Sequence, residues 1–185
     1  MKALRIIGGI VAFILLGLLV FAWFLPSVFE SENSIIIKAP VDEVYGHVID
    51  MNTWNNWQIL DTNITNKVMP RDGRPDSLVW TGMAGVQGSI VIDSTSVDEY
   101  IRFIYRYHNQ PDDFQYGHMY FVPSPEGTVV TWKHNNDVGW NPILRFALNF
   151  TDEWKKLFDD TLKQLKEDIE SRKKEESQPG VESFG

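Results

Sequence analysis

Four histidines are the side chains best suited to acid–base or metal chemistry, because the 185-residue sequence contains no cysteine. No two of them have the spacing of a helical zinc site, and the sequence has neither a Gly-x-Ser-x-Gly elbow nor a P-loop lysine. His47 falls on the helix side opposite its apolar stripe, so we expect it in solvent, and His108 belongs to a turn. His118 and His134 fall in apolar, strand-like segments. The sequence therefore predicts no metal site and assigns no catalytic residue.

Aromatic residues are the clearest excess in the composition, since phenylalanine, tryptophan and tyrosine total 24. Most of them must pack in a core, because each ring buries a large apolar area. Trp54 and Trp57 stand out, three residues apart, directly after a predicted helix. Such a pair fits either a structural role, closing that helix on the rest of the fold, or contact with an apolar ligand.

The helices that must position these side chains follow from apolar periodicity. Pro40 opens a helix whose apolar stripe includes Val41, Val44 and Val48. A long final helix begins at Asn141-Pro142. Its apolar face comprises Trp154, Leu157, Phe158, Leu162, Leu165 and Ile169.

Strand-like segments separated by turn residues fill the space between the helices. They lie at residues 34–38, 64–69, 77–81, 88–97, 100–107, 114–122 and 128–134. Short loops between consecutive strands predict an antiparallel meander, and with the helices this gives an α+β fold. In segment 114–122 both alternating faces are apolar, so the pattern leaves open which of them points inward.

The N-terminal segment, residues 6–25, has no charged side chain and is long enough to cross a bilayer. Lys2 and Arg5 precede it, which places the N-terminus in the cytoplasm and the rest of the chain on the other side, periplasmic or extracellular in a bacterium. A cleaved signal peptide is the alternative. Its apolar core is usually shorter, about 7–15 residues, and cleavage after Ala22 would leave Trp-Phe-Leu at the new N-terminus. We therefore expect an uncleaved single-pass anchor.

The chain divides into an anchor at residues 1–25, a linker at 26–33, one domain at 34–171 and a polar tail at 172–185. The net charge of −8 argues against a nucleic-acid partner. Neither the oligomeric state nor the identity of a ligand follows from the composition.

Three segments resemble the SRPBCC superfamily, which includes START-like, polyketide cyclase/dehydrase and lipid-transport proteins. They are IKAPVDEVYGHVIDMNTWNNW at 37–57, GTVVTWKHN at 127–135 and LFDDTLKQLKEDIE at 157–170. The similarity spans residues 33–171 and also fits bacterial members that carry a single N-terminal anchor. It implies the helix-grip fold, in which an antiparallel sheet curves around a long C-terminal helix.

The resemblance further implies a ligand cavity between sheet and helix. We expect no cofactor. The candidate ligand contacts are Trp57, Phe103, Tyr105, Tyr116, His118, Trp132 and His134. We expect a membrane-tethered domain that binds an apolar small molecule or lipid, with Tyr116, His118 or His134 setting its orientation. The alternatives are a cyclase, dehydratase or hydrolase acting on a hydrophobic substrate, and an interaction module of an envelope complex without a ligand.

Overall fold

The computed structural model describes residues 2–58, 65–71, 74–81, 87–107, 110–150 and 153–176. Its helices are α1 (Lys2–Trp23), α2 (Val41–Ile49), a short 3-10 turn η1 (Met51–Thr53), α3 (Trp54–Trp57), α4 (Pro142–Phe150) and α5 (Glu153–Glu176). Its strands are β1 (Val28–Ile37), β2 (Thr65–Arg71), β3 (Arg74–Thr81), β4 (Gln87–Ser96), β5 (Tyr100–Tyr107), β6 (Gln110–Ser124) and β7 (Gly127–Asp137). His108 and residues 82–86 lie outside the described residues.

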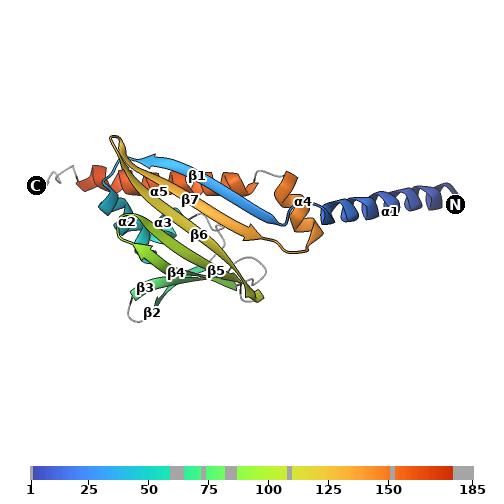
Figure 1. The fold of residues 1–185 in the computed structure, drawn as a ribbon, viewed down its shortest axis with the longest axis horizontal. Helices are drawn as coiled ribbons and strands as arrows, with labels where there is room; N and C mark the ends of the chain where they lie inside the picture. The colour runs from blue at the N-terminus through green and yellow to red at the C-terminus, as the bar shows by residue number, and fades with distance from the viewer. Residues whose placement is uncertain are drawn as a thin grey trace, which may run out of the picture.

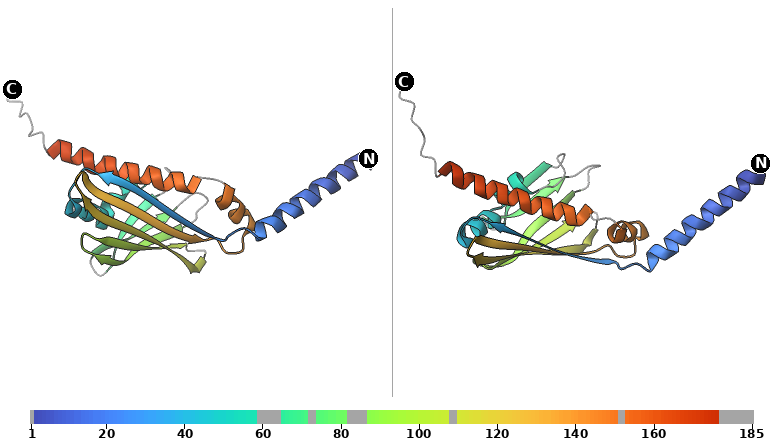
Figure 2. Two further views of the ribbon diagram at one scale, coloured as in Figure 1. Left: turned by 45° about the horizontal axis from the view of Figure 1, so that its top comes forward. Right: turned by 90° about the horizontal axis from the view of Figure 1, so that it is seen from above.

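All seven strands form one antiparallel sheet in the order β1-β7-β6-β5-β4-β3-β2 (Figure 1). Strands β2 to β7 follow one another as a meander, while β1 pairs with β7 from the other end of the sequence. Figure 2 shows α5 lying along one face of the curved sheet, with α4 between the sheet and α1. The predicted α+β helix-grip architecture is confirmed.

The first strand begins at Val28, whereas the sequence pattern predicted a linker up to residue 33. The reason is that β1 turns polar side chains inward, since Ser31 and Asn33 are only 8% and 4% exposed. Apolar alternation was the signal for a strand, and these two buried polar residues remove it. The final helical segment also differs from the prediction, because the structure has two helices there, α4 and α5.

The two tryptophans after α2 lie in the centre of the core. Trp54 and Trp57 are fully buried, and the Trp54 ring lies 4.9 Å from those of Trp57 and Phe103. The Trp54 indole Nε1 donates a hydrogen bond to the Val48 carbonyl at 2.8 Å, in the last turn of α2. The Trp-x-x-Trp pair therefore fixes α2 and α3 to the sheet, as one of the two sequence interpretations proposed.

His47 is not in solvent, and that prediction was wrong. Its side chain is 9% exposed, and its Nε2 lies 2.8 Å from Asp168 Oδ2 on α5. Burial lowers the pKa of His47, while the Asp168 carboxylate opposes this shift. His47 of α2 thus contacts the C-terminal half of α5 through Asp168, a long-range contact that local periodicity could not reveal.

Gly127, which begins β7 after the tight turn from β6, has a φ of +134°, a conformation suited only to glycine. A Cβ at this position would overlap the Ile37 carbonyl oxygen and approach Lys38 Cα to 2.9 Å. We expect Gly127→Ala to lower the free energy of unfolding by about 3 kcal/mol, measured by urea unfolding of the full chain in detergent.

Gly139 provides the matched control, because its φ is +59° and a Cβ there would meet nothing within 4 Å. Gly139→Ala should cost only about 1 kcal/mol, the intrinsic penalty of the left-handed conformation. Equal losses in the two variants would contradict the close approach at Gly127.

Candidate functional site

The face of the sheet that α5 covers can be read residue by residue along β7. Val130, Trp132 and His134 are buried at alternate positions, whereas Lys133 and Asn135 between and after them are exposed. We call the covered side the inner face. The prediction that His134 shares a face with Val130 and Trp132 is confirmed.

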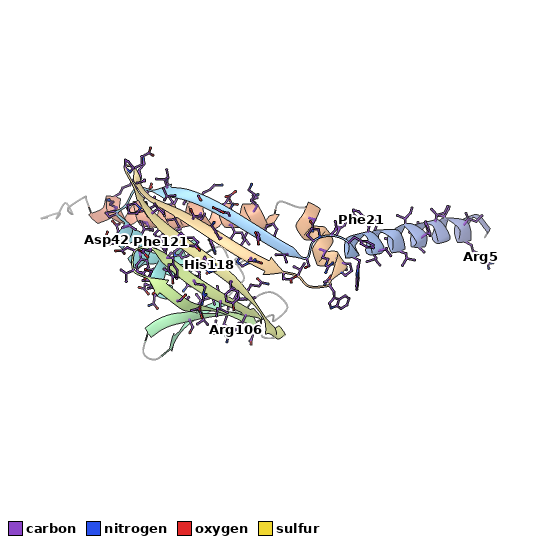
Figure 3. The ribbon with its side chains drawn as sticks, viewed as in Figure 1. Arg5, Phe21, Asp42, Arg106, His118 and Phe121 are labelled. Atoms are coloured by element: carbon purple, nitrogen blue, oxygen red, sulfur yellow. The ribbon has the colours of Figure 1, made fainter. Side chains whose placement is uncertain are left out.

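On β6 the inner face carries Gly117, Met119 and Phe121, all of them buried. Tyr116 and His118 therefore point to the outer face, where Tyr116 is 37% exposed. This settles the question that the sequence left open for segment 114–122; Figure 3 labels His118 and Phe121, which belong to opposite faces of the strand.

Tyr116 and His118 belong instead to an outer surface of rings and charges. The Arg102 guanidinium lies 5.8 Å from the Tyr116 ring centre, and the His118 ring stacks on Tyr120 at 6.1 Å. Partial burial, followed by the positive charge of Arg102, lowers the pKa of His118. These two residues do not join the other five predicted contacts.

Five of the seven predicted residues lie on the inner face or under it, in two groups. Trp57 and Phe103 pack with Trp54 in the fully buried core. Tyr105, Trp132 and His134 form a second group around Phe158 of α5. The ring centres lie 5.2 Å apart for Tyr105 and His134, 4.9 Å for His134 and Phe158, and 5.0 Å for Trp132 and Phe158.

Phe158 was predicted as part of the apolar face of the final helix but not as a site residue. We call Tyr105, Trp132, His134 and Phe158 the ring cluster. Its members come from two strands and a helix far apart in sequence, so only the folded chain brings them together.

Gly117 provides the room for this cluster on β6. A Cβ there would lie 2.8 Å from Tyr105 Cε2 and 3.3 Å from Trp132 Nε1. Because glycine has no side chain, both rings approach the backbone of the central strand closely. The absence of a side chain at Gly117 therefore allows the rings of Tyr105 and Trp132 to pack against β6.

The ring cluster contains two buried hydrogen-bonding atoms without a protein partner. Trp132 Nε1 and His134 Nδ1 are shielded from solvent, and no described residue hydrogen-bonds to either. Each such atom costs about 1–3 kcal/mol when it is left unpaired. Burial alone lowers the pKa of His134 from 6.5 to about 4, so the imidazole is neutral at pH 7.

A polar corner, defined as Ser31, Asn33 and Asp159, adjoins the ring cluster. Ser31 is paired with His134 in the β1–β7 register. Ser31 Oγ donates to Asn33 Oδ1 at 2.5 Å, and Asn33 Nδ2 donates to Asp159 Oδ1 at 2.6 Å. The sequence analysis missed this corner because it assigned Ser31 and Asn33 to a linker.

The chemistry available here is that of hydrogen bonding in an apolar setting. Trp132 Nε1 can only donate, while a neutral imidazole offers one donor and one acceptor nitrogen. Burial is the cause of the lowered pKa of His134, and none of the described residues hydrogen-bonds to its Nδ1, as a carboxylate orienting a general base would. Among the described residues, no group of three or more histidines and carboxylates has the arrangement of a metal site.

Comparison with known proteins supports the fold. A family model described as polyketide cyclase / dehydrase and lipid transport matches residues 28–170. Protein SA2116 from Staphylococcus aureus, of unknown function, has a TM-score of 0.60 and 14% identity, covering 80% of this chain and 96% of its own. CV1439 from Chromobacterium violaceum has a TM-score of 0.56 and 15% identity, covering 76% of this chain and 96% of its own.

NE0264 from Nitrosomonas europaea gives the same TM-score and identity, 0.56 and 15%, covering 78% of this chain and 96% of its own. Comparison with curated proteins finds no match. At such low identities the solved structures show the fold alone.

Proposed function

Because the chain belongs to the polyketide cyclase/dehydrase and lipid transport family, we propose that its domain binds an apolar small molecule or a lipid between the inner face of the sheet and α5. The single observation that carries this proposal is the pair of buried atoms in the ring cluster, Trp132 Nε1 and His134 Nδ1. A ligand with one polar group at this position would satisfy them.

The donors and acceptors of the ring cluster define the kind of polar group that a ligand would need. Trp132 needs an acceptor oxygen, and the neutral His134 can take or give one hydrogen bond. A hydroxyl, ester or carboxylic acid group fits both requirements. The rest of the ligand would gain affinity from burial against aromatic rings, at about 25 cal/mol per Å² of apolar area before ordering costs.

We also propose that α1 holds the domain at a membrane. Among the described residues, α1 is the only helix whose length and hydropathy suffice to cross a bilayer. Signal sequences also meet this criterion. It is almost wholly exposed, so it is not a core helix of the domain. With Lys2 and Arg5 at its start, the positive-inside rule places the domain on the non-cytoplasmic side.

The ligand-binding proposal is tested with a diazirine-bearing fatty acid and the full chain in lipid vesicles. We expect photo-cross-links on β7 and α5 as well as on α1, located by mass spectrometry of the peptides. Trp132→Phe keeps the ring and removes the Nε1 donor. It should lower the β7 and α5 cross-link yield about two- to tenfold, the range of one net hydrogen bond.

Tyr120→Phe is the matched control, because it also removes one hydrogen-bond donor and keeps a ring, but Tyr120 is 37% exposed on the outer face of β6. It should leave the yield on β7 and α5 unchanged. Cross-links confined to α1 in the unsubstituted chain would contradict binding between sheet and helix.

A further inference from the structure

Helix α4 exposes large apolar side chains next to the end of α1. Trp140, two residues before the helix, is 73% exposed, and Ile143 and Phe146 within it are 71% and 42% exposed. Ile143 and Phe146 are three residues apart and so lie on the same side of the helix. A helix on the surface of a water-soluble domain normally turns such a side toward the core.

Two polar side chains of α4 hold the helix to the end of α1. Arg145 Nη1 donates to the Trp23 and Leu25 carbonyls at 2.7 and 3.2 Å. Its Nε donates to the Gly139 carbonyl at 2.7 Å. Asn149 Nδ2 donates to the Pro26 carbonyl at 3.2 Å. Helix α4 is therefore attached by polar groups to the carboxyl end of α1, while Ile143 and Phe146 leave an apolar side partly uncovered.

The apolar surface of α4 continues onto α1. Trp23 and Phe24 are 56% and 80% exposed, and the Trp23 ring lies 6.5 Å from that of Trp140. Figure 3 labels Phe21 near the end of α1 that meets α4 and Arg5 near the opposite end. The uncovered side of α4 thus adjoins the point where the proposed anchor would leave the bilayer.

We propose that Trp140, Ile143 and Phe146 insert into the lipid headgroup region, so that α4 lies along the surface of the same bilayer that α1 spans. This rests on the proposed anchoring by α1. Tryptophan prefers the membrane interface, and an amphipathic helix at that depth buries its apolar side about 5–10 Å into the boundary between headgroups and acyl chains. The attachment of α4 to α1 by Arg145 and Asn149 holds its uncovered side next to the membrane.

This position has a consequence for the ligand site. His134 lies three residues before Asp137, where β7 ends and the chain continues into α4. Ser31, its partner in β1, lies on the stretch of β1 that directly follows α1. The end of the sheet that carries the ring cluster and the polar corner is therefore the end nearest the bilayer.

Single-cysteine labelling tests the proposal cleanly, because the chain has no cysteine of its own. The full chain carries a polarity-sensitive fluorophore at one of three positions: Ile143→Cys, Leu16→Cys in α1, or Val97→Cys. Val97 is 72% exposed in the turn between β4 and β5. The protein is reconstituted into phosphatidylcholine vesicles containing lipids with a nitroxide quencher near the headgroup or deep in the acyl chain.

We expect the label at Ile143→Cys to be quenched at least about twofold by the shallow nitroxide, as the interfacial depth requires. The label at Leu16→Cys should be quenched most by the deep nitroxide, and the label at Val97→Cys by neither. This pattern would support both the anchor and the interfacial position of α4.

The contrary outcomes separate the two proposals. Quenching at Leu16→Cys without quenching at Ile143→Cys would overturn the interfacial position of α4 and leave the anchor standing. In that case, oxidation of the unlabelled Ile143→Cys chain with copper phenanthroline to a disulfide-linked dimer would identify a second copy of the chain as the occupant. Absence of quenching at both positions would overturn the anchor and, with it, this inference.

Discussion

Trp54→Ala is expected to lower the free energy of unfolding by about 3–5 kcal/mol, the usual cost of truncating a fully buried tryptophan. The Trp54 ring is inaccessible to solvent and packs against Trp57 and Phe103. The substitution also removes the hydrogen bond from Nε1 to the Val48 carbonyl. Since small domains are stable by only about 5–15 kcal/mol, much of the native population would be lost at moderate denaturant.

The measurement is urea unfolding of the full chain in detergent, followed by near-ultraviolet circular dichroism. Trp140→Ala is the matched control, because it removes the same side chain from a site that is 73% exposed. In detergent it should change the free energy of unfolding by less than about 0.5 kcal/mol. A loss below about 1 kcal/mol for Trp54→Ala would show that this tryptophan does not fix α2 and α3 to the sheet.

The second large effect is a loss of stability on acidification that depends on His134. Its pKa is about 4 in the folded chain because the side chain is buried, against 6.5 for an exposed histidine. Between these two values the unfolded chain binds a proton that the folded chain excludes. The stability from the neutral imidazole is therefore present above pH 6.5 and is lost as the pH falls toward 4, by about 3 kcal/mol in total.

His134→Leu isolates this contribution. At pH 7 the variant should be as stable as the unsubstituted chain or slightly more stable, because it removes a buried nitrogen without a partner. Between pH 7 and 4 it should lose about 3 kcal/mol less than the unsubstituted chain, as measured by urea unfolding at a series of pH values.

His118→Leu serves as the comparison, since His118 lies on the outer face and is only partly buried. The pKa of His118 is also lowered, so its substitution acts in the same direction but should have a smaller effect. Parallel pH profiles for His134→Leu and the unsubstituted chain would contradict the buried, neutral state of His134.

Local patterns predicted much of the fold. The predicted strand at residues 100–107 agrees with β5, and the apolar stripe after Pro40 agrees with the buried residues of α2. These features depend on alternation at a period of two or on helical spacing, which neighbouring residues alone determine. The structural role of the Trp-x-x-Trp pair was instead expected from its resemblance to the SRPBCC superfamily, with ligand contact as the alternative.

The candidate site was harder to predict from the sequence than the fold, because long-range packing decides which residues come together in it. On β6, both Tyr116-x-His118 and Met119-x-Phe121 are apolar enough to face inward. Gly117 was the available signal, since a glycine inside a strand marks a close approach of another group. Here that group is the ring of Tyr105 on the neighbouring strand.

Buried polar residues were the other obstacle. Ser31 and Asn33 do not resemble a strand that faces a core, and their burial becomes understandable only when Asp159 on α5 accepts a hydrogen bond from Asn33. His47 is a similar case, because its partner Asp168 lies far along the chain. Polar pairs of this kind cannot be read from the periodicity of either segment.

Residues 24–27 are the whole connection between α1 and β1, and the Ser27 carbonyl already accepts a hydrogen bond from Val138 N at 3.0 Å. On the proposed anchoring, so short a connection gives the domain almost no freedom to explore the space away from the bilayer. Its encounters with membrane molecules would be governed by lateral diffusion in two dimensions and a high effective concentration. A water-soluble donor or acceptor of the ligand would have to travel to the membrane surface itself.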